Sequence, residues 1–447
     1  MAEKTQNGSS TLAAFACVTT LFFAWGFVTS IIDPLIPAVK SVFTLNYAES
    51  MLTQFAWFIA YGVVSLPAAA LLSRLGFVSS IVVALAAMVL GCLLVPAATM
   101  LDMYPGVLLA LFVIASGVTL LQVAANPLVA ALGAPERSHF RLTLSQAFNS
   151  LGTVIGPYLG ATIMLSGGLF GADIALDHAT NRAETLRSID AQFLIVAVFF
   201  AALALFIWLV RARIGAASPP REQGASPWRA FASGWALFGA LAIFLYVGAE
   251  VAIASVMINF LVEIDFIAFL TRVGFVDALA SVSLIDPASP PEEIAGKTLG
   301  LCYWGGAMVG RFVGSVLLTR MSAGMLLAIA AAVATGLCLF VAQSTDAAGG
   351  VAALAVGFFN SIMFPTIFTL TLARSRAPTS AVSGLLCMAI VGGAVIPPLM
   401  GLAADSIGLS RAFFVPLAAY LGIAAFASAA ALGGRTRVPA AVAPATH

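Results

Sequence analysis

Charged residues are scarce in this chain. Asp, Glu, Lys and Arg make up 9% of its 447 residues and 61% of the residues are hydrophobic, whereas soluble domains carry about 25% charged residues. A soluble fold cannot bury that much apolar surface, so this composition excludes a soluble protein. We expect a protein embedded in a lipid bilayer, without a nucleic-acid partner.

Histidine and paired cysteine are also scarce. Two of the three histidines, His139 and His178, lie in predicted loops and His447 is the last residue, which leaves none at membrane depth to relay protons or bind metal. The five cysteines show no CxxC spacing, which argues against a disulfide framework and against a zinc site. We therefore expect no metal, no cofactor and no enzymatic activity.

Long apolar runs fill most of the chain. Each is about 20 residues or longer, enough to cross the hydrocarbon core of a bilayer, and short charged stretches separate them. We predict twelve membrane-spanning segments, at residues 12–39, 47–73, 78–99, 105–132, 138–167, 190–210, 229–262, 297–319, 323–343, 348–374, 379–404 and 410–433.

The loops between these segments differ in charge. Basic residues gather in alternate loops and in both terminal tails: Lys4, Arg74, Arg137, Arg141, Arg211, Arg213, Arg221, Arg229, Arg320, Arg374, Arg376, Arg435 and Arg437. The other loops hold fewer basic residues and most of the acidic ones. Because basic loops stay inside, we predict a multi-pass protein of the bacterial-type inner (plasma) membrane with both termini in the cytoplasm.

The polar stretch at residues 211–228 divides the predicted segments six and six. It predicts an N-terminal bundle at 1–210, a cytoplasmic linker at 211–228 and a C-terminal bundle at 229–447. A weak repeat supports this division, since Pro127 and Pro365 are 238 residues apart and Pro157 and Pro398 are 241 apart. We predict an all-α membrane protein with twelve transmembrane helices in two pseudo-symmetric six-helix bundles, the major facilitator fold.

Prolines inside the apolar runs predict interrupted helices. Pro34, Pro127, Pro157, Pro365 and Pro397 each lie within or at the end of a predicted span. Broken helices are tolerated in membranes where the backbone is packed in protein or lines a water-filled cavity. These spans are therefore candidates for lining a path.

Three charged residues lie well inside the predicted spans, away from the span ends: Asp33, Glu250 and Arg311. Intramembrane carboxylates are costly and usually serve ion or substrate handling. We therefore assign proton coupling to Asp33. Glu250 either shares this coupling or binds a sugar. Asp33 has an alternative role as a helix-capping residue before Pro34. Glu250 has an alternative role as the partner of Arg311 in a structural ion pair, and Arg311 is expected at the cytoplasmic edge, gripping helix ends.

Uncharged amides form the larger polar set. Gln122 and Asn126 are four residues apart and Gln146 and Asn149 are three apart, so each pair shares one helical face. Amides donate and accept hydrogen bonds, which suits a neutral polyhydroxylated solute, although interhelical bonding is a common alternative in membranes. The remaining candidate binding residues are the amides Asn259 and Asn360 and the aromatics Trp25, Trp304 and Phe364.

The chain resembles the fucose–galactose–glucose permease family of major facilitators. The resemblance rests on segments 23–27 (FAWGF), 46–50 (NYAES), 121–127 (LQVAANP), 146–149 (QAFN), 303–306 (YWGG) and 360–365 (NSIMFP). It implies a sugar symporter, usually proton driven, with Asp33 in the place of the coupling aspartate, Gln146 and Asn149 in sugar-binding places, and Trp25 as an aromatic lining residue.

The resemblance also bears on the substrate. Fucose permeases carry a glutamate where this chain has Gln122 and a tyrosine where it has Phe364, so the chain looks more like the glucose and galactose branch. We predict a monomeric importer of a hexose by proton symport. Sodium coupling, an amino-sugar or other hexose substrate and, more distantly, drug export stay as alternatives.

Overall fold

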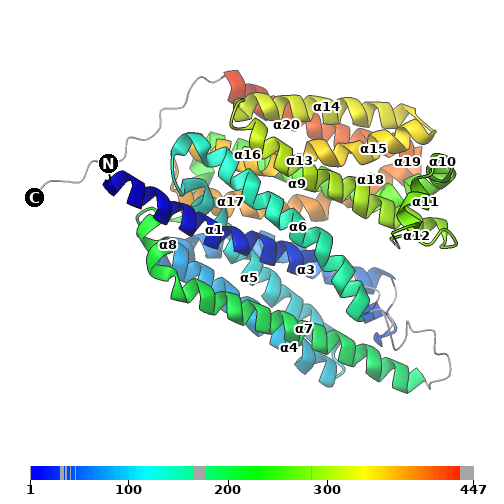
Figure 1. Ribbon diagram of the computed structural model, residues 1–447, viewed down its shortest axis with the longest axis horizontal. Coiled ribbons are helices and arrows are strands. Elements are labelled where there is room, and N and C mark those ends of the chain that lie inside the picture. Colours follow the sequence, from blue (N-terminus) through cyan, green and yellow to red (C-terminus); the bar gives the residue numbers. More distant parts are fainter. Residues whose placement is uncertain are drawn as a thin grey trace, which may run out of the picture.

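The computed structural model describes residues 2–30, 35, 38–40, 42–45, 47–164, 178–282 and 284–432. These residues form helices and no strands. Two groups of long helices lie side by side along the molecule (Figure 1). The first group contains α1 (Ala2–Ser30), α3 (Tyr47–Leu75), α4 (Phe77–Met100), α5 (Tyr104–Ala131), η1 (Pro135–Arg137), α6 (Ser138–Met164) and α7 (His178–Leu209).

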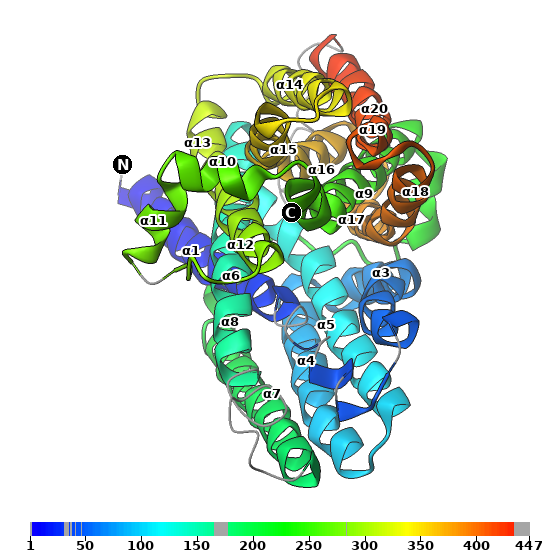
Figure 2. The same cartoon turned by 90° about the vertical axis from the view of Figure 1, so that its right-hand side faces the viewer.

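The second group is formed by the C-terminal part of the chain, and Figure 2 shows many of its helices nearly end-on, with helices of the first group such as α7 seen obliquely. It contains α9 (Gly234–Glu263), α12 (Pro291–Thr298), η4 (Leu299–Trp304), α13 (Gly305–Leu317), α14 (Ala323–Gln343), α15 (Ala347–Asn360), α16 (Met363–Arg374), α17 (Thr379–Met388), η5 (Ala389–Val391), α18 (Gly392–Ile407), α19 (Leu409–Ala412) and α20 (Phe414–Leu432). We call the two groups the N half and the C half.

Short elements mark the two ends of the molecule. In the sequence, α8 (Arg211–Ala217) and η3 (Pro227–Ala232) connect the N half to the C half. They lie at the end of the molecule where α1 begins, which we call the linker end. At the opposite end, α10 (Phe266–Arg272) and α11 (Phe275–Ala280) precede α12. The apolar spacing of residues 266–276 follows from packing, because Phe266, Leu270 and Val276 are buried.

The twelve predicted spans all correspond to helices, in the two-bundle arrangement that the sequence predicts. Ten helical runs among the described residues are long and apolar enough to cross a membrane. The more polar α6 and the continuous run α12–η4–α13 complete the twelve. Some boundaries differ, since α7 begins at His178 rather than at 190 and the α12 run begins at Pro291 rather than at 297.

Most of the prolines lie inside continuous helices. Pro127 lies within α5 and Pro397 within α18, because neighbouring helices in a membrane protein satisfy the backbone groups that a proline frees. Pro365 follows a true interruption at Ser361–Ile362, between α15 and α16. Pro34 lies outside the described residues. The interrupted-helix prediction therefore holds at Pro365 and is wrong for Pro127 in α5, Pro157 in α6 and Pro397 in α18.

Glycines allow the closest helix crossings. A Cβ atom at Gly26 of α1 would lie 2.2 Å from the Asn149 carbonyl oxygen of α6, and one at Gly152 would lie 2.4 Å from the Phe23 carbonyl oxygen. Small residues let helix backbones approach in membranes, where van der Waals packing drives association. The same device recurs in the C half, where a Cβ at Gly392 of η5–α18 would lie 2.1 Å from the Phe244 carbonyl oxygen of α9.

The halves are joined by hydrogen bonds at the linker end. Ser383 Oγ of α17 donates to the Val123 carbonyl of α5 over 2.7 Å, and His139 Nδ1 of α6 lies 2.6 Å from Thr369 Oγ1 of α16. His139 therefore lies in the first turn of a helix rather than in a loop. These contacts close the seam between the halves at this end.

The segment between the halves also contacts both of them. The Glu222 carboxylate accepts hydrogen bonds from Thr379 N (2.8 Å), Ser380 N (3.0 Å) and Ser380 Oγ (2.8 Å) at the start of α17. A carboxylate at a helix N-terminus is favoured by the unpaired N–H groups and by the helix dipole. The neighbouring Arg221 packs over Gly76, the residue before α4, so the segment holds the N half on one side and the C half on the other.

Replacing Gly152 by Val is expected to destabilise the folded protein by about 1–3 kcal/mol, because the added methyl groups overpack the α1–α6 crossing. Thermal unfolding of the detergent-solubilised protein measures the effect as a lower melting temperature. Gly336→Val is the matched control, since a Cβ at Gly336 of α14 meets no atom within 4 Å. Equal melting temperatures for the two variants would contradict the close crossing.

Replacing Glu222 by Ala is expected to open the linker end more often. The loss of charge-assisted hydrogen bonds, each contributing about 1.5–3 kcal/mol, should speed hydrogen–deuterium exchange of the Thr379 and Ser380 amides roughly tenfold or more. Glu136→Ala, at an exposed acid of η1 near the same end, should leave that exchange unchanged. Unaltered exchange in the Glu222 variant would mean that this carboxylate does not hold α17.

Candidate functional site

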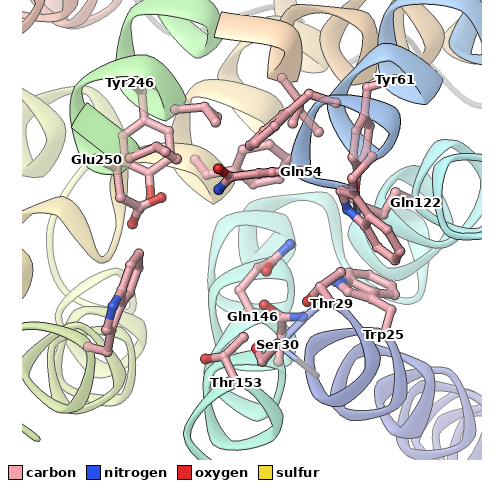
Figure 3. Close-up of a pocket in the computed structure, with 18 of the residues that line it drawn as sticks. Trp25, Thr29, Ser30, Gln54, Tyr61, Gln122, Gln146, Thr153, Tyr246 and Glu250 are labelled. Atoms are coloured by element: carbon pink, nitrogen blue, oxygen red, sulfur yellow. Dashed lines mark hydrogen bonds between the residues drawn. The ribbon is translucent and has the colours of Figure 1, made fainter. Parts of the chain in front are cut away.

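A cavity of about 340 Å³ lies between the two halves. The N half contributes side chains from four helices, and most of them are polar or aromatic: Trp25, Thr29, Ser30, Gln54, Trp57, Phe58, Tyr61, Gln122, Gln146, Asn149 and Thr153. The volume falls in the range of small-molecule sites. Figure 3 shows Gln146, Ser30, Trp25 and Gln122 on this side of the cavity.

The C half supplies a smaller and chemically different wall. It consists of Tyr246, Val247, Glu250, Val251, Trp304, Arg311, Phe364 and Ile390. Tyr246 and Glu250 of α9 lie opposite the amides of the N half (Figure 3). Both walls carry aromatic rings, but the N-half wall is rich in amides and hydroxyls, whereas the C-half wall carries a carboxylate and a guanidinium.

The α1–α6 crossing fixes the amide wall. The backbone contact at Gly26 and Gly152 places Trp25, Thr29 and Ser30 of α1 beside residues of α6 in one lining. Asn149 Nδ2 donates to the Phe22 carbonyl over 3.0 Å, and its Oδ1 has no partner among the described residues. An oriented acceptor therefore lies at the cavity surface.

Gln122 and Gln146 are also held by neighbouring side chains. Gln122 Nε2 donates to Tyr61 Oη over 2.8 Å, and Gln146 Nε2 lies 3.4 Å from Asn126 Oδ1. Asn126 is fully buried one turn from Gln122 and is not part of the lining, and its own Nδ2 has no hydrogen-bond partner in the structure. The structure thus places Gln122, Gln146 and Asn149 at the cavity and Asn126 behind them, so the predicted shared face of Gln122 and Asn126 does not bring both to the lining.

Two other predicted amides lie outside the cavity lining. The Asn259 side chain is exposed. Asn360 is fully buried, with its Nδ2 donating to Tyr303 Oη (3.0 Å) and its Oδ1 accepting from Tyr420 Oη (2.7 Å). These bonds occupy Asn360 within the C half.

Glu250 faces the cavity, and among the described residues its carboxylate has no ion-pair partner within 4.0 Å. Tyr246 Oη donates to Glu250 Oε1 over 2.7 Å. The structure describes both Glu250 and Arg311, and it forms no ion pair within 4.0 Å between them. The structural ion pair considered from the sequence is therefore absent.

Arg311 lies in the cavity wall rather than at a cytoplasmic helix edge, so that prediction was wrong. Its Nη1 donates to Ser150 Oγ and lies 3.4 Å from the Gln146 carbonyl oxygen, both on α6, while its Nε donates to the Ser361 carbonyl over 3.1 Å. The guanidinium group carries five N–H donors in a rigid plane, so it can bond acceptors that lie in different directions. Arg311 thus connects the C half to the helix that carries Gln146 and Asn149.

Several lining residues were not predicted from the sequence. Thr29, Ser30, Gln54, Tyr61 and Thr153 carry polar groups at the cavity. Thr29 and Ser30 lie close to Asp33 in the sequence, and Gln54 and Tyr61 are seven residues apart, a spacing that returns to one helical face. That spacing was the available signal. Asp33 itself lies outside the described residues.

The arrangement suits a small, neutral, polar solute. Amide and hydroxyl groups offer both donors and acceptors, and Trp25, Trp304 and Phe364 offer flat apolar surfaces in the same cavity. In the part of the chain that the structure describes, no three His, Cys, Asp or Glu side chains gather in a way that holds a metal ion. The described lining thus offers donors, acceptors and flat apolar surfaces that suit such a solute.

Comparison with known proteins gives consistent matches over most of the chain. A sequence profile of the Major Facilitator Superfamily matches residues 18–386. The chain is 42% identical over 418 residues to the glucose/galactose transporter of Brucella abortus (strain 2308), with 92% of each protein covered. It is 31% identical over 445 residues to the L-fucose-proton symporter of Escherichia coli K12, covering 94% of this chain and 93% of the symporter.

A solved structure is similar as well. The crystal structure of the major facilitator transporter FucP in the outward conformation superimposes with a TM-score of 0.79 and 26% sequence identity. The match covers 94% of this chain and 99% of that chain. The likeness therefore extends over both halves.

Proposed function

The chain belongs to the Major Facilitator Superfamily, and from that premise we propose that it imports a glucose- or galactose-type hexose by proton symport. The observation that carries the proposal is the cavity between the halves, where amides, hydroxyls and aromatic rings meet. The 42% identity to a protein named as a glucose/galactose transporter supports the same substrate class. Alternating access would expose the cavity to each side of the membrane in turn.

The sugar contacts follow from the lining. Gln122, Gln146 and Asn149 would bond hydroxyl groups, because each presents amide atoms at the cavity surface. Trp25 and Phe364 would pack against the apolar C–H face of the ring. Asn126 would act indirectly through Gln146.

Asn259 and Asn360 have no sugar contact in this proposal. Neither residue lines the cavity. Asn360 is instead bonded to Tyr303 and Tyr420. The binding set is therefore smaller than the sequence alone suggested.

Proton coupling is assigned to Asp33. A carboxylate within a predicted span is retained at an energetic cost and usually handles ions or substrate. Thr29 and Ser30, four and three residues before Asp33 in the sequence, line the cavity. Glu250 is the second carboxylate of the proposal, either sharing the coupling or binding the sugar.

The orientation follows from the basic loops. Arg74, Arg137, Arg211, Arg229 and Arg374 belong to connections at the linker end, so we assign that end and both termini to the cytoplasm of a bacterial inner membrane. With that assignment, the hydrogen bonds that close the seam at the linker end would belong to a state closed toward the cytoplasm. The cavity is lined by a single chain, which supports function as a monomer.

Replacing Asp33 by Asn is expected to abolish accumulation driven by a pH gradient while sugar exchange persists, because the amide cannot carry a proton. Radiolabelled hexose uptake into proteoliposomes, with and without an inward proton gradient, measures both activities. Asp277→Asn, at an exposed acid of α11, is the matched control and should keep both. Gradient-driven accumulation by the Asp33 variant at the wild-type level would refute its coupling role.

The coupling ion is tested with the wild-type protein. Replacing sodium by potassium or choline at fixed pH should leave accumulation unchanged if protons are the coupled ion. A loss of uptake without sodium would replace proton coupling by sodium coupling, since a carboxylate with amide oxygens also suits a small hard cation.

The substrate class is tested with a panel of sugars on purified protein. Glucose and galactose are expected to raise the melting temperature, because a ligand that binds only the folded state stabilises it. L-fucose, glucosamine and an apolar drug are the comparison ligands. Stabilisation by the drug alone would favour an exporter, and stabilisation by glucosamine or L-fucose alone would reassign the sugar.

A further inference from the structure

A chain of buried hydrogen bonds lies behind the C-half wall, and the proposed function gives it no role. Tyr420 Oη donates to Asn360 Oδ1 over 2.7 Å, and Asn360 Nδ2 donates to Tyr303 Oη over 3.0 Å. Tyr303 Oη in turn donates to the backbone carbonyl of Glu250 over 3.2 Å. Tyr303, Asn360 and Tyr420 are all fully buried. The chain therefore ends at the residue whose carboxylate faces the cavity.

The π-helical stretch η4 connects this chain to the cavity. It spans Leu299–Trp304, and its last two residues point differently, with Tyr303 buried and Trp304 in the cavity lining. Their rings meet edge to face, with centroids 5.1 Å apart. Gly357 of α15 permits this packing, because a Cβ there would lie 2.3 Å from the Tyr303 carbonyl oxygen. Such π-helical turns are frequent at functional sites.

The Glu250 carboxylate is oriented and has one oxygen free. Oε1 accepts from Tyr246 Oη, while Oε2 has no hydrogen-bond partner among the described residues. A carboxylate removed from bulk water is costly unless hydrogen bonds compensate it. The positive charge of Arg311 in the same cavity offsets part of that cost, and donors supplied by a solute would compensate it further.

We propose that Glu250 and Trp304 form a sugar-recognition subsite on the C half, an inference that rests on the proposed hexose transport. The carboxylate accepts hydrogen bonds from two neighbouring sugar hydroxyls, and the indole packs against the apolar face of the same ring. Arg311 lines the same cavity, so a neutral pyranose suits the subsite better than an amino sugar. Glu250 then serves recognition, and ion coupling belongs to Asp33.

Tyr303 and Asn360 are positioning residues in this arrangement. Neither residue lines the cavity. Tyr303 donates to the Glu250 carbonyl and belongs to the turn that presents Trp304, and Asn360 bonds the Tyr303 hydroxyl. Their effect on a sugar passes through Glu250 and Trp304. Asn360 thus has a role in binding that differs from direct contact.

The experiment measures binding of glucose and its 2-, 3-, 4- and 6-deoxy analogues to purified protein by calorimetry. In the wild type, loss of a hydroxyl bound by Glu250 should weaken binding about tenfold or more, as expected for a hydrogen bond to a charged group. In Glu250→Ala, the deoxy analogues that lack a hydroxyl bound by Glu250 should bind within about twofold of glucose. The variant has already lost the carboxylate that this hydroxyl would bond, so removing the hydroxyl costs little more. Glu250→Gln, of the same shape, should give an intermediate loss, and Glu263→Gln, at an exposed position of the same helix, should match the wild type.

The positioning role has a separate measurement. Tyr303→Phe and Asn360→Ala should reduce the discrimination against the same deoxy sugars, with little further effect when combined with Glu250→Ala. A purely structural role would lower the melting temperature and weaken all sugars equally. That uniform pattern would overturn the positioning assignment.

Proteoliposome uptake distinguishes recognition from coupling. Glu250→Gln should keep accumulation driven by a pH gradient, with a raised KM. A variant that shows the full wild-type discrimination among deoxy sugars but no accumulation would overturn the subsite and make Glu250 a coupling residue. If the wild type bound none of the hexoses, the proposed function itself would fail. If the wild type bound hexoses and the Glu250 variants bound them equally well, only the subsite would fail.

Discussion

The site depends on a contact between two backbones. Gly26 and Gly152 bring α1 and α6 so close that any side chain at either position would meet a main-chain oxygen of the other helix. Because no flexible side chain separates the helices, their relative rotation is fixed. Trp25 and Ser30 of α1 therefore share a wall with Gln146 and Asn149 of α6. Two glycines thus set the positions of the polar side chains in this wall of the cavity.

Most of the fold could be predicted from the lengths of the apolar runs. The run at 323–343 corresponds to α14 residue for residue, because charged or polar neighbours bound it on both sides. The run predicted at 297–319 was too short at its start, since the first turn of α12 is polar. Prolines were less informative, because packing decides whether a freed backbone group finds a partner.

The candidate site was predictable only in part. Helical spacing correctly grouped Gln146 with Asn149, and both reach the cavity. The same reasoning could not separate Asn360 from them, because an amide in a membrane needs hydrogen bonds whether its partner is a solute or another side chain. The role of Arg311 depended on which helix of the other half lay opposite, and spacing within one sequence carries no such information.

The two walls of the cavity belong to different halves, and this division has a mechanical consequence. A solute that bonds to the amides of α6 and to the carboxylate of α9 at the same time becomes a temporary cross-link between two rigid bodies. That cross-link stabilises the protein most when the two walls are close enough for the solute to bond to both. The cargo itself would then favour the occluded arrangement, and a molecule too short to span the gap could enter without promoting the conformational change.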